Sequence, residues 1–115
     1  MKRFVRSSAV NGVVQAPASK SVAQRAIALA SMAEGRSEIL NVGNSDDCQA
    51  AIRVCKDLGA TIDGDTNHLI VDGGLKLPAR PLNCGESGLS IRMFSPIAST
   101  LNGDITLIGD GSLMN

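Results

Sequence analysis

The sequence has few aromatic side chains and no excess charge of either sign. Its 115 residues include two Phe and no Tyr or Trp, and 11 Lys and Arg balance 11 Asp and Glu. Proteins that stack nucleobases need aromatic rings, and proteins that follow a phosphate backbone need a basic surface. Neither requirement is met, so we expect no nucleic-acid partner.

Signatures of metal binding, disulfide bonding and membrane insertion are also missing. The one histidine, His68, and the cysteines at positions 48, 55 and 84 match no zinc-ligand spacing. An odd number of cysteines does not suit a disulfide framework, and the start MKRFVRSSAV lacks the apolar segment of a signal peptide. No apolar run approaches the roughly 18 residues of a membrane span. These absences predict a cytoplasmic protein without a metal or a membrane partner.

The residues that are present indicate an α/β domain. Hydrophobic residues make up 43% of the sequence, and short apolar runs alternate with segments of helical period. Strands are expected at residues 3–6, 12–15, 36–42, 82–84 and 104–108, with a hairpin over 60–72. Helices are expected at residues 20–34, between Ser45 and Gly59, and from residue 88 to about 100.

Each expected helix has an apolar face that predicts its buried side. The first helix is predicted to bury a stripe of five residues, Val22, Ala26, Leu29, Ala30 and Ala33. Cys48 and Cys55, seven residues apart on one face of the second helix, are interpreted as small core residues. The third helix is predicted to face inward with Met93, Phe94, Ile97, Ala98 and Leu101.

An internal repeat links the first and third helices. Residues 19–35 resemble residues 87–103, which lie 68 positions later, and a serine begins and a glycine ends both segments. The residues after each glycine read as a strand. The pattern predicts a repeated helix–strand unit, of which the second copy is incomplete.

Residues 16–26, APASKSVAQRA, form the first candidate binding site. Ser19, Lys20 and Ser21 fall at the start of a helix, where unpaired N–H groups and the helix dipole favour an anion. Arg25 lies one turn after Ser21 on the same helix face. The pattern fits an anion site, and it also fits a capped and solvated helix start.

Residues 85–92, GESGLSIR, form the second candidate site. Gly88 permits a close approach of the backbone to a ligand, and Arg92 lies four residues later on the same face. Glu86 and Ser87 belong to the same turn and are further candidates. An ordinary strand-to-helix turn would explain the same residues. Two helix starts on one side of the molecule would suit a ligand with more than one anionic group.

Other motifs of catalysis are weak or missing. Asp46 and Asp47 could be read as an acid/base pair, but they follow Ser45 in the first turn of a helix, where the dipole favours carboxylates. No Ser/His/Asp arrangement, Walker loop or dinucleotide fingerprint can be assembled from the sequence.

Taken together, the motifs resemble the N-terminal part of the 5-enolpyruvylshikimate-3-phosphate synthase family, the 3-phosphoshikimate 1-carboxyvinyltransferases. The resemblance is carried by SKSVAQRA at 19–26, Gly35, Asn41, SDD at 45–47, LG at 58–59, the SG and Arg of 87–92, and GDG at 109–111. The match runs across essentially the whole chain. Because the family enzyme is several times longer, the resemblance implies an N-terminal fragment.

The resemblance implies a fold of repeated βαβαββ units in two lobes, the inside-out α/β barrel of the enolpyruvyl transferases. About one and a half units would be present. Residues 16–83 would form the first unit and residues 84–115 an incomplete second one, in agreement with the internal repeat. Residues 1–15 would supply strands to the other lobe, which is missing from this chain.

The resemblance also implies a reaction in the shikimate pathway to chorismate and the aromatic amino acids. The enolpyruvyl group of phosphoenolpyruvate passes to the 5-hydroxyl of shikimate 3-phosphate, and phosphate is released. Lys20 would contact both substrates, Ser21 and Arg25 would bind shikimate 3-phosphate, and the Gly88 backbone would approach phosphoenolpyruvate. The enzyme would be a monomer without a cofactor. Its catalytic acid/base groups would lie in the other lobe, so the isolated fragment is expected to be inactive.

The sequence departs from the family pattern at the second candidate site. The family's usual Asn-Ala-Gly-Thr is replaced by Glu86, Ser87, Gly88 and Leu89. A carboxylate near an anion site must turn away or pair with a cation, and this is the expectation for Glu86. A phosphoenolpyruvate-binding arginine of the family aligns with Ser112, so that role is assigned to no residue here.

Two other functions compete with this interpretation. The sister enolpyruvyl transferase that acts on UDP-N-acetylglucosamine carries Lys-Asn in place of Lys20 and Ser21, and a reactive loop cysteine with no counterpart here. The chain could also be a non-catalytic anion-binding α/β domain, against which the incomplete second repeat argues.

Overall fold

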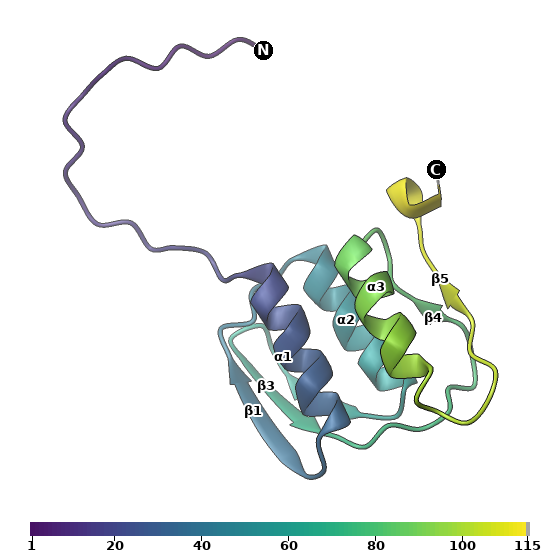
Figure 1. The fold of residues 1–115 in the computed structure, drawn as a ribbon. Coiled ribbons are helices and arrows are strands. Elements are labelled where there is room, and N and C mark those ends of the chain that lie inside the picture. The colour runs from purple at the N-terminus through teal and green to yellow at the C-terminus, as the bar shows by residue number, and fades with distance from the viewer. Residues whose placement is uncertain (115) are drawn as a thin grey trace.

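The computed structural model describes residues 1–114, which contain three α-helices, a 3₁₀ helix and two small sheets, and the α-helices lie between the two sheets (Figure 1). In chain order the elements are α1 (Lys20–Met32), β1 (Arg36–Leu40), α2 (Asp46–Asp57), β2 (Thr61–Gly64), β3 (His68–Asp72), β4 (Leu82–Asn83), α3 (Gly88–Ala98), β5 (Leu107–Ile108) and the 3₁₀ helix η1 (Gly111–Met114). The α/β class and the predicted helices are therefore confirmed. Among the described residues, no helix is long and apolar enough to cross a membrane.

The strands form two sheets of different topology. In the first, β3 lies between β1 and β2 and is antiparallel to both, with Ile39 opposite Leu69 and Ile62 opposite Val71. In the second, β4 and β5 are parallel and α3 connects them. A parallel pair needs such a crossover helix. Both copies thus contain a helix followed by a strand.

The helix starts follow from their capping residues. At α2, the Ser45 hydroxyl accepts a hydrogen bond from the Cys48 N–H at 3.2 Å, and at α3 the Ser87 hydroxyl accepts one from the Ser90 N–H at 3.1 Å. Ser19 occupies the same position before α1 but makes no side-chain capping bond. The predicted position of that cap is confirmed, while the hydrogen bond that defines a Ser cap is absent.

The predicted strands at residues 3–6 and 12–15 are wrong for this structure. Residues 1–17 form no strand and run exposed and extended away from the helices (Figure 1). A two-stranded hairpin is marginal in water unless a further strand or helix covers its apolar face. No such element packs against these residues in the described part of the chain. Their assignment to another lobe stays a prediction.

The buried side of α1 also differs from the prediction. Val22 and Leu29, predicted to face inward, are 63% and 67% exposed. The buried residues of the helix are Ala23, Gln24, Ile27, Ala28, Ala30 and Ser31. The helix has two apolar stripes about one residue apart, and α2 with the first sheet covers the stripe of Ala23 and Ile27. The other stripe remains open toward α3.

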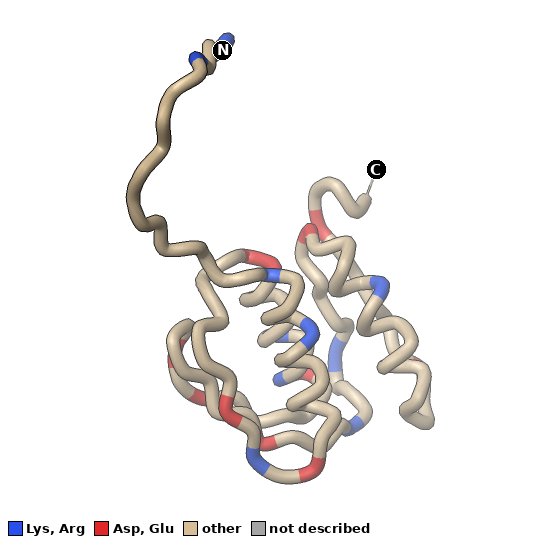
Figure 2. Tube along the Cα trace, turned by 60° about the vertical axis from the view of Figure 1, so that its left-hand side comes forward, with Lys and Arg blue, Asp and Glu red and all other residues tan. Residues whose placement is uncertain are grey.

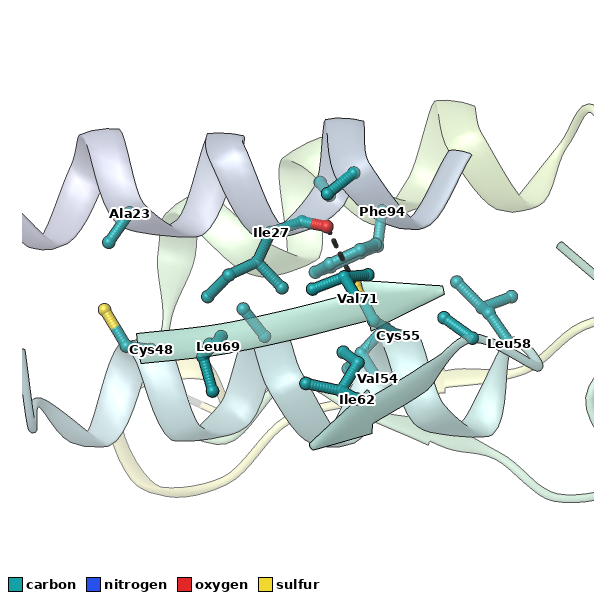
Figure 3. Close-up of a cluster of buried hydrophobic side chains, with 14 of the residues drawn as sticks. Ala23, Ile27, Cys48, Val54, Cys55, Leu58, Ile62, Leu69, Val71 and Phe94 are labelled. Atoms are coloured by element: carbon teal, nitrogen blue, oxygen red, sulfur yellow. Dashed lines mark hydrogen bonds between the residues drawn. The ribbon is translucent and has the colours of Figure 1, made fainter. Parts of the chain in front are cut away.

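One hydrophobic core joins the helices to the first sheet (Figure 3). Ile27 of α1, Val54 of α2, Leu58 directly after α2, Val71 of β3 and Phe94 of α3 are each at most 1% exposed. The three cysteines are buried free thiols, which confirms Cys48 and Cys55 as core residues.

The Cys55 thiol predicts a change of stability at alkaline pH. Burial raises the pKa of this thiol to about 11, from an ordinary value of about 9. The unfolded chain therefore loses the thiol proton first, and stability falls as pH rises from about 9 toward 11. We expect the free energy of unfolding of the unmodified chain, measured by urea titration, to fall by about 2 kcal/mol more than that of Cys55→Ala over this range. Equal slopes for both proteins would contradict the expectation.

Candidate functional site

The first candidate site lies where α1 and α2 begin side by side. Lys20 is the first residue of α1, and its Nζ lies 2.8 Å from Oδ2 of Asp47 in the first turn of α2. The hydrogen bond to Asp47 and the charge of this carboxylate raise the pKa of Lys20, so the ammonium form is favoured. The cation is thus held beside the free N–H groups of two helix starts.

The sequence did not predict the pairing of Lys20 with Asp47. The sequence favours Asp47 as a residue that stabilises the start of its own helix over a member of an acid/base pair, and neither interpretation includes Lys20. That role holds, because Asp46 and Asp47 both lie in the first turn of α2. The contact with Lys20 depends on how α1 packs against α2, and no spacing in the sequence encodes this packing.

Arg25 extends along α1 toward the same helix start. Its guanidinium is exposed, and Nη1 donates a hydrogen bond to the backbone oxygen of Ser21 at 3.1 Å. This geometry confirms that Arg25 and Ser21 share one face of the helix. Among residues 1–114, Arg25 has no acidic partner, so its other N–H groups are available to an anion.

The two glycines at the turn before α3, Gly85 and Gly88, have different structural roles. Gly85 has a φ of +59°, a conformation that favours glycine, and its N–H donates to Oδ1 of Asn83 at 2.7 Å. Gly88 is the first helical residue of α3, and a Cβ placed there would meet no atom closer than 3.8 Å, Nη2 of Arg92. The local structure requires a glycine at 85 and does not require one at 88. A ligand that packs directly against the Gly88 backbone would explain why a glycine stands at this position.

Glu86 turns away from the helix start, as one of the two expectations for it stated. Its Oε2 accepts a hydrogen bond from the backbone N–H of Ser112 at 3.2 Å. A Cβ at Gly111 would collide with the Glu86 carboxylate, so the side chain packs directly on this turn. The carboxylate therefore anchors η1 instead of pairing with a cation, and Ser112 contributes its backbone to that contact.

A groove between α1 and α3 brings the two candidate sites together. Arg25 from α1 and Arg92 from α3 both line this groove, which has a volume of about 390 Å³. The remaining lining residues are Ala28, Leu29, Met32, Leu89, Met93 and Ile97. Nε of Arg92 donates to the Gly88 oxygen at 2.8 Å, as Arg25 does to Ser21. The cationic positions of α1 and α3 can be followed along the chain in Figure 2.

The chemistry of these residues is that of anion binding. Lys20, Arg25 and Arg92 supply positive charge, and two helix starts supply N–H groups. Among the described residues, no group of three or more His, Cys, Asp and Glu side chains could hold a metal ion. The geometry therefore suits a ligand with several anionic groups.

Comparison with known proteins identifies the family. Residues 5–115 match the family model of EPSP synthase (3-phosphoshikimate 1-carboxyvinyltransferase). The chain is 42% identical over 117 residues to the 3-phosphoshikimate 1-carboxyvinyltransferase of Methanocorpusculum labreanum, covering 98% of this chain and 28% of that protein. It is 39% identical to the protein of the same name from Nitrosopumilus maritimus, covering 98% of this chain and 27% of the other. The chain thus spans about a quarter of the length of these curated relatives.

A solved structure agrees with the sequence relatives. EPSP synthase from Acinetobacter baumannii superimposes with a TM-score of 0.81 at 33% sequence identity, over 89% of this chain and 24% of that one. The resemblance found in the sequence and the predicted fold class are thereby confirmed. The chain belongs to the EPSP synthase family.

Proposed function

We propose that this chain forms part of an enzyme that transfers the enolpyruvyl group of phosphoenolpyruvate to the 5-hydroxyl of shikimate 3-phosphate, with release of phosphate. One observation carries the proposal. Arg25 of α1 and Arg92 of α3 line one groove, and Lys20 and Gly88 are the first residues of these two helices. Both substrates carry several negative charges, which this arrangement suits.

The proposed roles follow the positions of the side chains. Ser21 and Arg25 bind shikimate 3-phosphate at the start of α1, and Lys20 contacts both substrates from the junction with α2. The Gly88 backbone approaches phosphoenolpyruvate, and Arg92 lies beside it. Glu86 and Ser87 take part indirectly, through the turn that positions Gly88.

None of these groups is placed as a general acid or base. The hydrogen bond to Asp47 raises the pKa of Lys20, which makes its ammonium group a weaker acid and leaves it no lone pair to act as a base, and the arginines stay protonated at all accessible pH values. The proton transfers that form and collapse a tetrahedral intermediate therefore belong to the rest of the protein. We further propose that this protein acts in the cytoplasm as a single chain.

The sister reaction with UDP-N-acetylglucosamine is less compatible with the site. The enzymes of that sister family carry a reactive loop cysteine, whereas Cys48, Cys55 and Cys84 of this chain are all buried. Burial raises the pKa of both Cys55 and Cys84, which disfavours the nucleophilic thiolate.

The proposal is tested by titrating the ¹⁵N-labelled 115-residue chain with shikimate 3-phosphate and following backbone amide shifts. Because the site is open to solvent, we expect a weak, roughly millimolar dissociation constant. The largest shifts are expected at residues 19–25, with smaller ones at Gly88. Shikimate and inorganic sulfate serve as controls.

Each outcome of this titration has a distinct meaning. Shikimate lacks the phosphate and should produce markedly smaller shifts. Equal responses to shikimate 3-phosphate and sulfate would show that the site binds anions without selectivity, and would contradict the proposed substrate. No response from a folded chain would contradict binding by this part of the protein.

A further inference from the structure

Among the side chains of residues 1–114, Gln24 is the one on α1 that makes hydrogen bonds to the start of α3. The residue is 1% exposed, and its Oε1 accepts hydrogen bonds from the hydroxyls of Ser87 at 2.9 Å and Ser90 at 3.0 Å. Its Nε2 donates to the backbone oxygen of Lys20 at 3.2 Å. The Lys20 oxygen can only accept, so the orientation of the amide is fixed and all these polar atoms are satisfied.

This network is the polar connection between the two candidate sites. Among the hydrogen bonds of residues 1–114, those that join α1 to the start of α3 are both accepted by Gln24. The Ser87 hydroxyl also caps α3 by accepting a hydrogen bond from the Ser90 N–H. The hydrogen bond that Ser87 donates to Gln24 therefore holds the capping residue of α3 in place. At its other end Gln24 holds the carbonyl of Lys20, the first residue of α1.

The rest of the contact between α1 and α3 is loose. The two helices are separated by the open groove that Leu29, Met32, Met93 and Ile97 line. Leu29 is 67% exposed and Met32 44% exposed. The side chains that line the groove therefore constrain the distance between the helix starts less closely than two directional bonds to a buried amide do.

We infer that Gln24 is a positioning residue that sets the start of α3, with Gly88, relative to the start of α1, with Lys20, Ser21 and Arg25. The inference rests on the proposed function, in which these two helix starts bind neighbouring anionic groups. Gln24 touches no ligand in this assignment. It acts through the Lys20 carbonyl on one side and through the Ser87 cap on the other.

The test uses Gln24→Met, which keeps the length and volume of the side chain and removes its hydrogen bonds. This change leaves the Ser87 and Ser90 hydroxyls buried without their acceptor, so stability falls. Adding Ser90→Ala removes one stranded hydroxyl, and the double variant should regain part of the lost stability. Gln49→Met on α2 is the matched control, because Gln49 makes only an exposed 3.4 Å contact with Asn44.

We expect binding not to follow stability in this series. In titrations with shikimate 3-phosphate, the Gly88 amide shift should be lost in both Gln24→Met and the double variant, while shifts at residues 19–21 persist. The dissociation constant should rise about threefold in both, and Gln49→Met should behave as the unmodified chain. Recovery of binding together with stability in the double variant would show a merely structural role and overturn the inference.

A measurement without ligand separates this inference from the proposed function. Residual dipolar couplings of backbone N–H vectors report the orientation of α3 relative to α1. We expect the couplings of residues 88–92 in the double variant to fit an orientation of α3 relative to α1 that differs from the orientation in the unmodified chain. If the unmodified chain failed to bind shikimate 3-phosphate, the proposed function would fail, and the couplings would still decide the role of Gln24. Unchanged couplings would refute it.

Discussion

Replacing Phe94 by alanine is expected to lower the free energy of unfolding by about 3–5 kcal/mol, the cost of removing a large buried aromatic side chain. Phe94 is 1% exposed and is the largest fully buried side chain among the described residues. It joins α3 to the core formed by α1, α2 and the first sheet (Figure 3). Small domains are stable by only about 5–15 kcal/mol, so this one change would consume much of the total.

The location of Phe94 makes its effect larger than that of its neighbours. Met93 lies next to it on α3 but is only partly buried and lines the open groove. Met93→Ala should therefore cost much less, about 1 kcal/mol. Urea denaturation of both variants, followed by circular dichroism, gives the comparison. Equal losses for the two variants would show that α3 is not anchored through Phe94.

Features that depend on neighbouring residues were predictable from the sequence. The Ser45 cap, the acidic first turn of α2 and the stop at Gly59, which has a φ of +100°, are all encoded within one segment. The same is true of the hairpin formed by β2 and β3. Local turn chemistry and apolar spacing determine such elements before any tertiary contact forms.

Features that depend on packing partners were not predictable in the same way. The choice between two apolar stripes on α1 depends on what covers the helix, and Val22 and Leu29 turned out to be exposed. The contacts of Lys20 with Asp47 and of Gln24 with Ser87 join residues far apart in the chain. A polar residue beside the buried stripe, as Gln24 is, would have been the available signal for the second contact.

Lys20→Ala is expected to weaken binding of shikimate 3-phosphate by about tenfold or more, because one hydrogen bond to a charged group contributes about 1.5–3 kcal/mol. The change removes the ammonium group, and it also exposes the charge of Asp47, whose carboxylate lies 2.8 Å from Lys20 in the intact site. A bare carboxylate would then face the anionic ligand at the helix start. Arg25→Ala uncovers no acidic group and should have the smaller effect.

A second substitution separates the two parts of the Lys20 effect. The double variant Lys20→Ala, Asp47→Ala removes the repulsive carboxylate along with its partner, so it should regain part of the lost affinity. Lys56→Ala is the matched control, since Lys56 is also an exposed cation but lies on α2 and lines a different hollow beside β2. Dissociation constants come from the amide shifts of Ser21 at one fixed ionic strength. If the double variant bound no better than Lys20→Ala, the pairing with Asp47 would have no part in binding. If Lys56→Ala weakened binding as much as Lys20→Ala, the effect of either lysine would be one of net charge, because only Lys20 lies at the shared start of α1 and α2.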